Sequence, residues 1–111
     1  MTIDSKSLDW RRIDLHGSVA ISRLCGEYVI HDFLRVPGTK YRIKVFEREA
    51  DFFALPNIAF RSADGSVDST CGLGATELEA LQDALAGVGA LLASRPSWSE
   101  SDLEWIDPRD F

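Results

Sequence analysis

The residues of this chain that could do chemistry begin with two histidines and two cysteines. His16 and His31 stand alone, without the neighbouring ligands at regular spacing that a metal site requires. Cys25 and Cys71 belong to no recognised nucleophile signature, and Cys71 lies too far before Thr76 to be activated by a helix N-terminus. We therefore expect no catalytic residue, no metal site and no enzyme activity. Both cysteines are interpreted as reduced, buried small residues.

A glycine-rich segment, residues 72–76 (GLGAT), is a second candidate because glycine-rich loops at helix starts can bind anions. It lacks the lysine of a P-loop and the third glycine of a dinucleotide-binding loop. We interpret it as a tight turn from a strand into a helix and expect no cofactor. Two alternatives stay open: a small regulatory domain that binds a ligand at this turn, and a cysteine-dependent enzyme.

The helix that follows is the clearest element of the sequence. Thr76 and Glu79 form a capping box, in which each side chain can bond a backbone amide at the helix start. The helix is predicted over about 77–93 and must end before Pro96, which cannot continue it. Apolar residues recur at steps of three and four and predict one buried stripe: Leu78, Leu81, Leu85, Val88 and Leu92.

Strands are predicted over about 28–72. Residues 41–48 alternate most regularly, with Tyr41, Ile43 and Val45 on one face. Residues 28–36 predict a second strand, bulged near His31 and Asp32. After these strands we expect a strand over 52–61 interrupted at 56–57, a hairpin turn at 64–65 and a returning strand over 67–72. Before them we expect a short strand at 19–21 broken at 25–27, and either a strand or a helical turn at 10–15.

These elements predict one domain, residues 1–111, of the α+β class: an antiparallel sheet of four or five strands with one long helix on one face. Residues 97–111 form an acidic, aromatic C-terminal segment with Trp98, Trp105 and Phe111. Disordered segments are poor in aromatic residues, so we expect this segment to dock on the sheet or the helix.

Charge is unevenly distributed along the chain, whose net charge is −6. Residues 1–48 hold nine basic and six acidic residues, whereas residues 49–111 hold three basic and twelve acidic ones. An acidic surface fits a basic partner and disfavours direct binding to nucleic acid, which needs clustered Lys and Arg. No run of apolar residues is long enough to span a membrane, and the first residues do not resemble a signal peptide. We therefore expect a cytoplasmic protein without a membrane partner.

Two stretches are similar to known families. Residues 52–60 (FFALPNIAF), a hairpin and residues 72–81 (GLGATELEAL) resemble the core of HicB-like antitoxins. Residues 105–111 (WIDPRDF) resemble the acidic ending of immunity proteins from contact-dependent growth inhibition systems. The resemblance implies a bacterial immunity protein that binds a cognate toxin domain, commonly a nuclease, and occludes its basic active site. A HicB-like antitoxin is the alternative within this class.

We expect the toxin contacts to come from the acids of the second half of the chain. These candidate partner-binding residues are Glu77, Glu79, Asp83, Glu100, Asp102, Glu104, Asp107 and Asp110. The sequence leaves the identity of the toxin, the face that binds it and the oligomeric state open.

Overall fold

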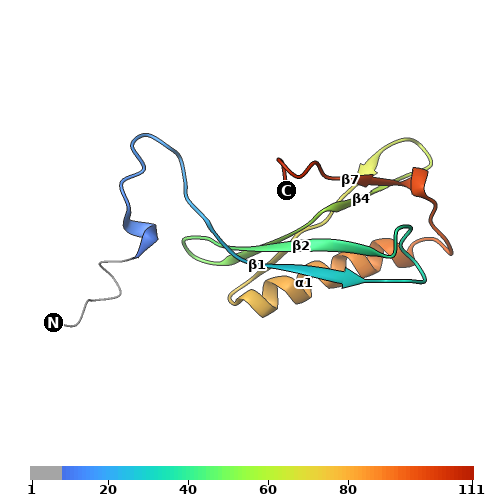
Figure 1. Ribbon diagram of the computed structural model, residues 1–111, viewed down its shortest axis with the longest axis horizontal. Helices are drawn as coiled ribbons and strands as arrows, with labels where there is room; N and C mark the ends of the chain where they lie inside the picture. The colour runs from blue at the N-terminus through green and yellow to red at the C-terminus, as the bar shows by residue number, and fades with distance from the viewer. Residues whose placement is uncertain (1–8) are drawn as a thin grey trace.

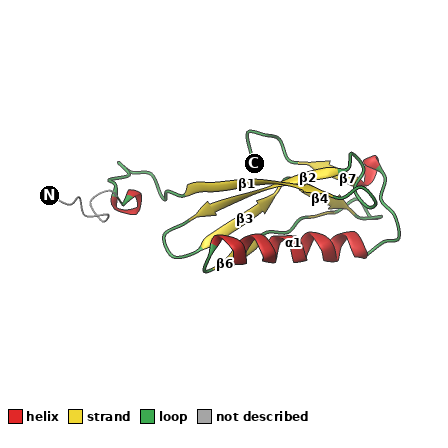
Figure 2. Cartoon of the chain, turned by 60° about the horizontal axis from the view of Figure 1, so that its bottom comes forward, coloured by secondary structure: helices red, strands yellow, loops and turns green. Residues whose placement is uncertain are grey.

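The computed structural model describes residues 9–111 and confirms the α+β class (Figures 1 and 2). One long helix, α1 (Glu77–Ala93), packs on one face of a four-stranded antiparallel sheet in the order β1-β2-β3-β6. The strands of this sheet are β1 (Arg23–His31), β2 (Lys40–Glu47), β3 (Phe52–Pro56) and β6 (Gly72–Gly74). A second, three-stranded sheet, which the sequence did not predict, consists of β5 (Val67–Asp68), β4 (Ile58–Arg61) and β7 (Leu103–Trp105).

The centre of the core lies between β2 and α1. Tyr41, Ile43 and Val45 are buried, as their alternation predicted, while Lys44 between them lies on the opposite face of the sheet. Their partners across the layer are the small and apolar residues of α1: Ala80, Ala84, Val88 and Leu92.

The predicted leucine stripe is wrong in its first half. Leu78 is 72% exposed, and the helix instead buries Ala80 and Ala84. The reason is close approach: a Cβ added at Gly72 would lie 2.1 Å from the carbonyl oxygen of Ala80. Only glycine on the strand and alanine on the helix fit this spacing, so α1 turns Leu78 to solvent and holds Leu81 and Leu85 at the margin of the core.

The interrupted strand over 52–61 is also revised, because its two halves belong to different sheets. Asn57 makes the transition: its N–H donates to the Arg42 carbonyl at 2.9 Å, and its side-chain Oδ1 accepts from the Arg42 N–H at 2.8 Å. Its own carbonyl accepts from the Ile106 N–H at 2.9 Å. Thus the end of β3 remains bonded to β2, and β4 continues beside β7 (Figure 1).

The first part of the chain departs most from expectation. Residues 19–21 form no strand, and β1 begins at Arg23 and passes through the predicted break at 25–27. The bulge lies between Leu24 and Gly26, not near His31, because β1 gives way to a turn after His31. Of the two alternatives for residues 10–15, the helical turn is present, as a short 3-10 helix over Trp10–Arg12.

The C-terminal segment docks on the body, as predicted. The Trp98 indole donates to the Leu92 carbonyl at 2.9 Å, and its ring meets Phe60 edge-on at 5.1 Å. A short 3-10 helix (Glu100–Asp102) then leads into β7, which pairs with β4. The segment therefore closes the second sheet at the end of the molecule farthest from the start of α1 (Figures 1 and 2).

Candidate protein-binding surface

Two of the predicted acids, Glu79 and Asp83, lie together where α1 runs beside β6. The Asp83 carboxylate accepts the Leu73 N–H at 3.0 Å, and the Glu79 carboxylate accepts the Ala75 N–H at 3.0 Å. The Thr76 hydroxyl accepts the Glu79 N–H at 3.1 Å, which confirms the capping interaction. Each carboxylate is thus oriented by a backbone amide of the strand-to-helix turn.

A shallow hollow of about 670 Å³ opens between these two acids. Its walls are Leu73, Gly74, Ala75, Glu79, Gln82, Asp83 and Ala86. None of the ion pairs formed within residues 9–111 includes Glu79 or Asp83. We call this feature the acidic hollow. Among residues 9–111 its two carboxylates have no basic partner, and each has one oxygen that forms no hydrogen bond with these residues.

Glu77 is separated from the acidic hollow although it lies on the same helix. Its carboxylate accepts the Tyr28 hydroxyl, so it faces β1 at the opposite edge of the sheet from β6. This hydrogen bond, together with burial, raises the pKa of Tyr28 above its ordinary value. A Cβ added at Gly26 would lie 2.9 Å from the Glu77 Oε2, so the bulged strand also leaves room for this carboxylate.

The acids of the C-terminal segment lie elsewhere again, and most are compensated within the chain. Asp102 lies 3.5 Å from Arg95 and also accepts the Ser99 N–H, the main cause of its lowered pKa. Glu104 pairs with Arg61 at 2.9 Å.

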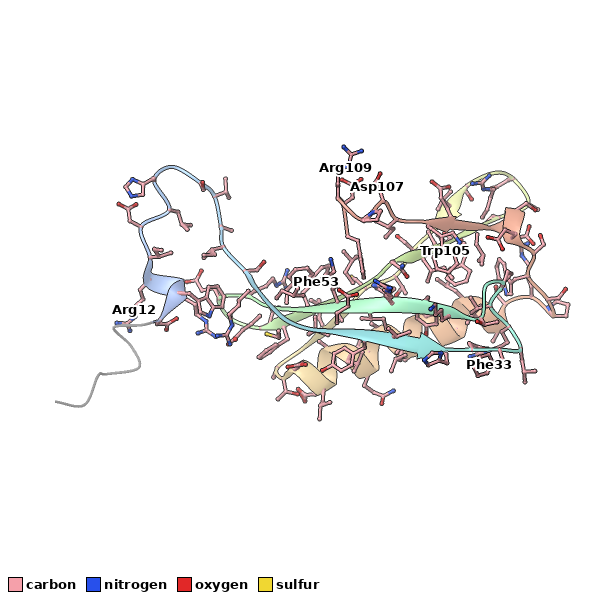
Figure 3. The ribbon with its side chains drawn as sticks, in the orientation of Figure 1. Arg12, Phe33, Phe53, Trp105, Asp107 and Arg109 are labelled. Atoms are coloured by element: carbon pink, nitrogen blue, oxygen red, sulfur yellow. The ribbon has the colours of Figure 1, made fainter. Side chains whose placement is uncertain are left out.

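Three acids of this segment remain. Asp107 pairs with Arg109 at 3.5 Å. Figure 3 shows both residues on the last segment of the chain. Glu100 and Asp110 are exposed and form no ion pair within the described residues. The eight predicted residues therefore do not form one surface.

The structure also shows features that the sequence patterns did not indicate. Phe33 and Leu34 project from the turn after β1, and Figure 3 shows Phe33 at one end of the molecule. At the other end, residues 11–22 and the β2–β3 turn enclose a hollow of about 340 Å³. Arg11 pairs with Glu47 at the end of β2, and this ion pair anchors residues 11–22 to the sheet. Arg23, the first residue of β1, pairs with the same carboxylate. No periodicity or motif marks these residues in the sequence.

The cysteines and histidines form no recognisable site in the part of the chain that the structure describes. Cys71 is exposed and Cys25 half-buried, so the prediction that both are buried is wrong, although neither forms a disulfide. Residues 9–111 contain no group of three or more His, Cys, Asp or Glu arranged to hold a metal ion. The same residues contain no helix with the length and apolar character that a membrane crossing requires.

Comparisons with models of protein families, with characterised proteins and with solved structures found no match to this chain.

Proposed function

We propose that this chain is an immunity-type protein that binds a basic toxin domain, of the nuclease class that the resemblance implies, and neutralises it by covering its active site. The observation that supports this proposal best is the acidic hollow. Glu79 and Asp83 are each held by a backbone amide, and each presents a second oxygen to solvent. Such an arrangement suits the guanidinium or ammonium groups of a basic protein surface.

Both carboxylates of the hollow are preorganised by backbone amides, and neither has a basic partner among the described residues. A flexible acidic side chain loses rotamer freedom when it binds a cation, and this loss reduces the affinity. The amides of Leu73 and Ala75 already fix Asp83 and Glu79 in the free protein. Charge-assisted hydrogen bonds to Arg or Lys then form with less ordering on binding.

The hollow does not favour the rival proposal of an anion-binding turn. The backbone amides of Leu73 and Ala75, which a phosphate would need, are already bonded to carboxylates. A phosphate placed there would have to displace two negative groups and then lie between them. The same chemistry that disfavours an anion favours a cationic partner.

The C-terminal segment contributes less in this proposal than the sequence pattern suggested. Asp102, Glu104 and Asp107 are paired with arginines of the same chain. Their field at a distance is therefore reduced, whereas Glu100 and Asp110 keep their full charge. We propose Glu79 and Asp83 as the main contacts and Glu100 and Asp110 as supplementary ones.

The proposal is tested by neutralising the hollow without changing its shape. Glu79→Gln with Asp83→Asn keeps an acceptor oxygen for each backbone amide and removes both charges. The probe is the polypeptide encoded immediately upstream in the native host, and affinity is measured by calorimetry at low and high salt. We expect at least about a tenfold loss of affinity, since each hydrogen bond to a charged group contributes roughly 1.5–3 kcal/mol.

Two matched controls complete this experiment. Glu49→Gln removes one exposed acid outside the hollow, and we expect unchanged affinity. Glu100→Gln with Asp110→Asn removes the two unpaired acids of the C-terminal segment and should weaken binding by a smaller factor than the hollow variant. Wild-type affinity in the hollow variant would show that Glu79 and Asp83 do not contact the partner.

A further inference from the structure

The two edges of the four-stranded sheet differ. One edge is β6, a strand of three residues, in which the Leu73 N–H that points away from β3 donates to the Asp83 carboxylate. At the other edge, β1 is nine residues long and pairs only with β2 among the described residues (Figure 2). A long edge strand with unpaired backbone groups is a template for another strand.

The hydrogen-bond phase of β1 shows which residues offer those groups. The Asp32 N–H donates to the Thr39 carbonyl at 2.8 Å, just beyond the pair formed by His31 and Lys40. Bonding alternates along an antiparallel pair, so the N–H and C=O of every second residue point away from β2. In β1 these are Glu27, Val29 and His31.

The side chains of these three residues are also accessible. All three lie on the face of the sheet opposite α1, and Val29 is 45% exposed. Their order along the strand is acid, apolar residue, imidazole. An antiparallel strand from a second copy, with Val29 facing Val29, places Glu27 of each copy opposite His31 of the other.

We propose that this chain forms a two-fold symmetric dimer through antiparallel pairing of β1 with β1 of a second copy. Three residue pairs then each exchange two main-chain hydrogen bonds: Val29 with Val29, and Glu27 with His31 twice. An imidazole N–H donates to a carboxylate whether or not the ring is protonated. On the other face, Tyr28 lies opposite Ile30, two half-buried residues at the margin of the core.

Neighbouring registers fit less well than the register centred on Val29. This difference favours β1 of a second copy as the partner strand. Centring the pair on Glu27 would place two carboxylates opposite each other, each paired with Arg42 of its own chain at 3.2 Å, and would lose the contacts between Glu27 and His31. Pairing Glu27 with Val29 of the other copy loses one of the three residue pairs. The self-complementary order of Glu27, Val29 and His31 favours a copy of the same strand over an arbitrary one.

Apolar groups next to the paired segment support the same arrangement. The turn that follows His31 exposes Phe33 and Leu34, the latter by 97%. In the two-fold register this turn approaches the beginning of the other copy's β1, where Leu24 is also exposed. The dimer would have a continuous eight-stranded sheet with both helices on one face. Because Asp83 blocks the β6 edge, assembly would stop at two copies.

The test is the mass of the full-length chain in solution, measured by sedimentation velocity over a range of concentrations. We expect a dimer whose dissociation constant rises at least tenfold on Val29→Pro, since this substitution removes an outward N–H and no bond to β2. Circular dichroism and thermal unfolding check that the variant folds. A wild-type chain that stays monomeric up to millimolar concentration, or a dimer unaffected by a folded Val29→Pro variant, would overturn the proposal.

Charge exchange gives an independent measurement if Val29→Pro does not fold. His31→Glu alone places two carboxylates opposite each other, and Glu27→Lys alone removes the carboxylate that accepts from the imidazole and sets an ammonium group beside Arg42, which pairs with Glu27 at 3.2 Å in the wild type. Each single variant should dissociate the dimer. The double variant restores opposite charges and should restore the dimer. Failure of the double variant to recover any association, while both single variants dissociate, would exclude this register.

Cross-linking locates the two-fold axis directly. In a Cys25→Ser, Cys71→Ser background, Val29→Cys should form an intermolecular disulfide, because facing residues of paired strands lie about 5.5 Å apart. The matched control is Leu73→Cys, which is similarly exposed on the same face but lies on the β6 edge. Equal cross-linking of the two variants would contradict pairing through β1. None of these readouts measures binding of a toxin.

Discussion

The carboxylate of Asp83 on α1 and the backbone amide of Leu73 on β6 are joined by a hydrogen bond of 3.0 Å. A helix side chain thus takes the place that a neighbouring strand would occupy at this edge of the sheet. This contact orients an acid toward solvent in the acidic hollow. At the opposite edge of the sheet, β1 pairs only with β2 among the described residues.

The first prediction concerns this contact. Asp83→Ala should lower the free energy of unfolding by less than about 1 kcal/mol, since the bond is exposed and water replaces the carboxylate. Hydrogen exchange of the Leu73 amide should become faster in the same variant. Asp83→Asn retains an acceptor and should protect this amide better than Asp83→Ala. Equal exchange rates in the two variants would show that the carboxylate does not hold the β6 edge.

A second prediction compares two glycines, one at the interface of helix and sheet and one within α1. A Cβ at Gly72 would lie 2.1 Å from the Ala80 carbonyl and 2.5 Å from the Ala84 amide nitrogen. Gly72→Ala should therefore cost about 3 kcal/mol or more, because backbone atoms must shift. Gly89→Ala meets no atom within 4 Å and should stabilise the helix by about 1 kcal/mol. Urea unfolding gives the free energy of unfolding of both variants, and equal values would contradict the close packing of Gly72 against α1.

The third prediction concerns pH. The hydrogen bond to Glu77 and burial raise the pKa of Tyr28, so the folded state holds the phenol proton more tightly than the unfolded chain does. The resulting stability is complete below the ordinary tyrosine pKa of about 10 and is lost as the pH rises through the folded value.

Tyr28→Phe should cost about 1 kcal/mol at neutral pH and should remove this part of the alkaline loss. Burial also raises the pKa of Tyr41, so the wild type and the variant must be compared at each pH. Parallel stability curves from pH 7 to 11 would show that Tyr28 and Glu77 are not coupled.

Local signals in the sequence predicted local structure well. Thr76 and Glu79 marked the start of α1, Pro96 limited its end, and the helix occupies the predicted residues. The alternation from Tyr41 to Val45 likewise predicted which side of β2 is buried. In each case the information lies in residues a few positions apart.

Contacts between distant segments were not predictable in this way. The face that α1 buries depends on how closely Ala80 can approach Gly72. The spacing of Leu78 in the sequence predicts that it is buried, and it does not indicate this contact. The change of sheet at Asn57 depends on Arg42 and Ile106, which are far away in the sequence. For the candidate site, the sequence indicated acidic residues but not which of them have arginine partners.

The sequence by itself determined the class of the fold, the limits of the helix, the most regular strand and the acidity of the second half of the chain. These properties follow from composition, periodicity and capping, which act over one or two turns of backbone. The tertiary structure alone decided that Glu79 and Asp83 line one hollow while Glu77 faces Tyr28. It also decided that Asp83 bonds the outward N–H at the β6 edge, whereas β1 pairs only with β2 among the described residues. Those outcomes depend on which amide, hydroxyl or guanidinium group lies next to each carboxylate when the strands and the helix pack together. The spacing of residues in the sequence does not predict these contacts.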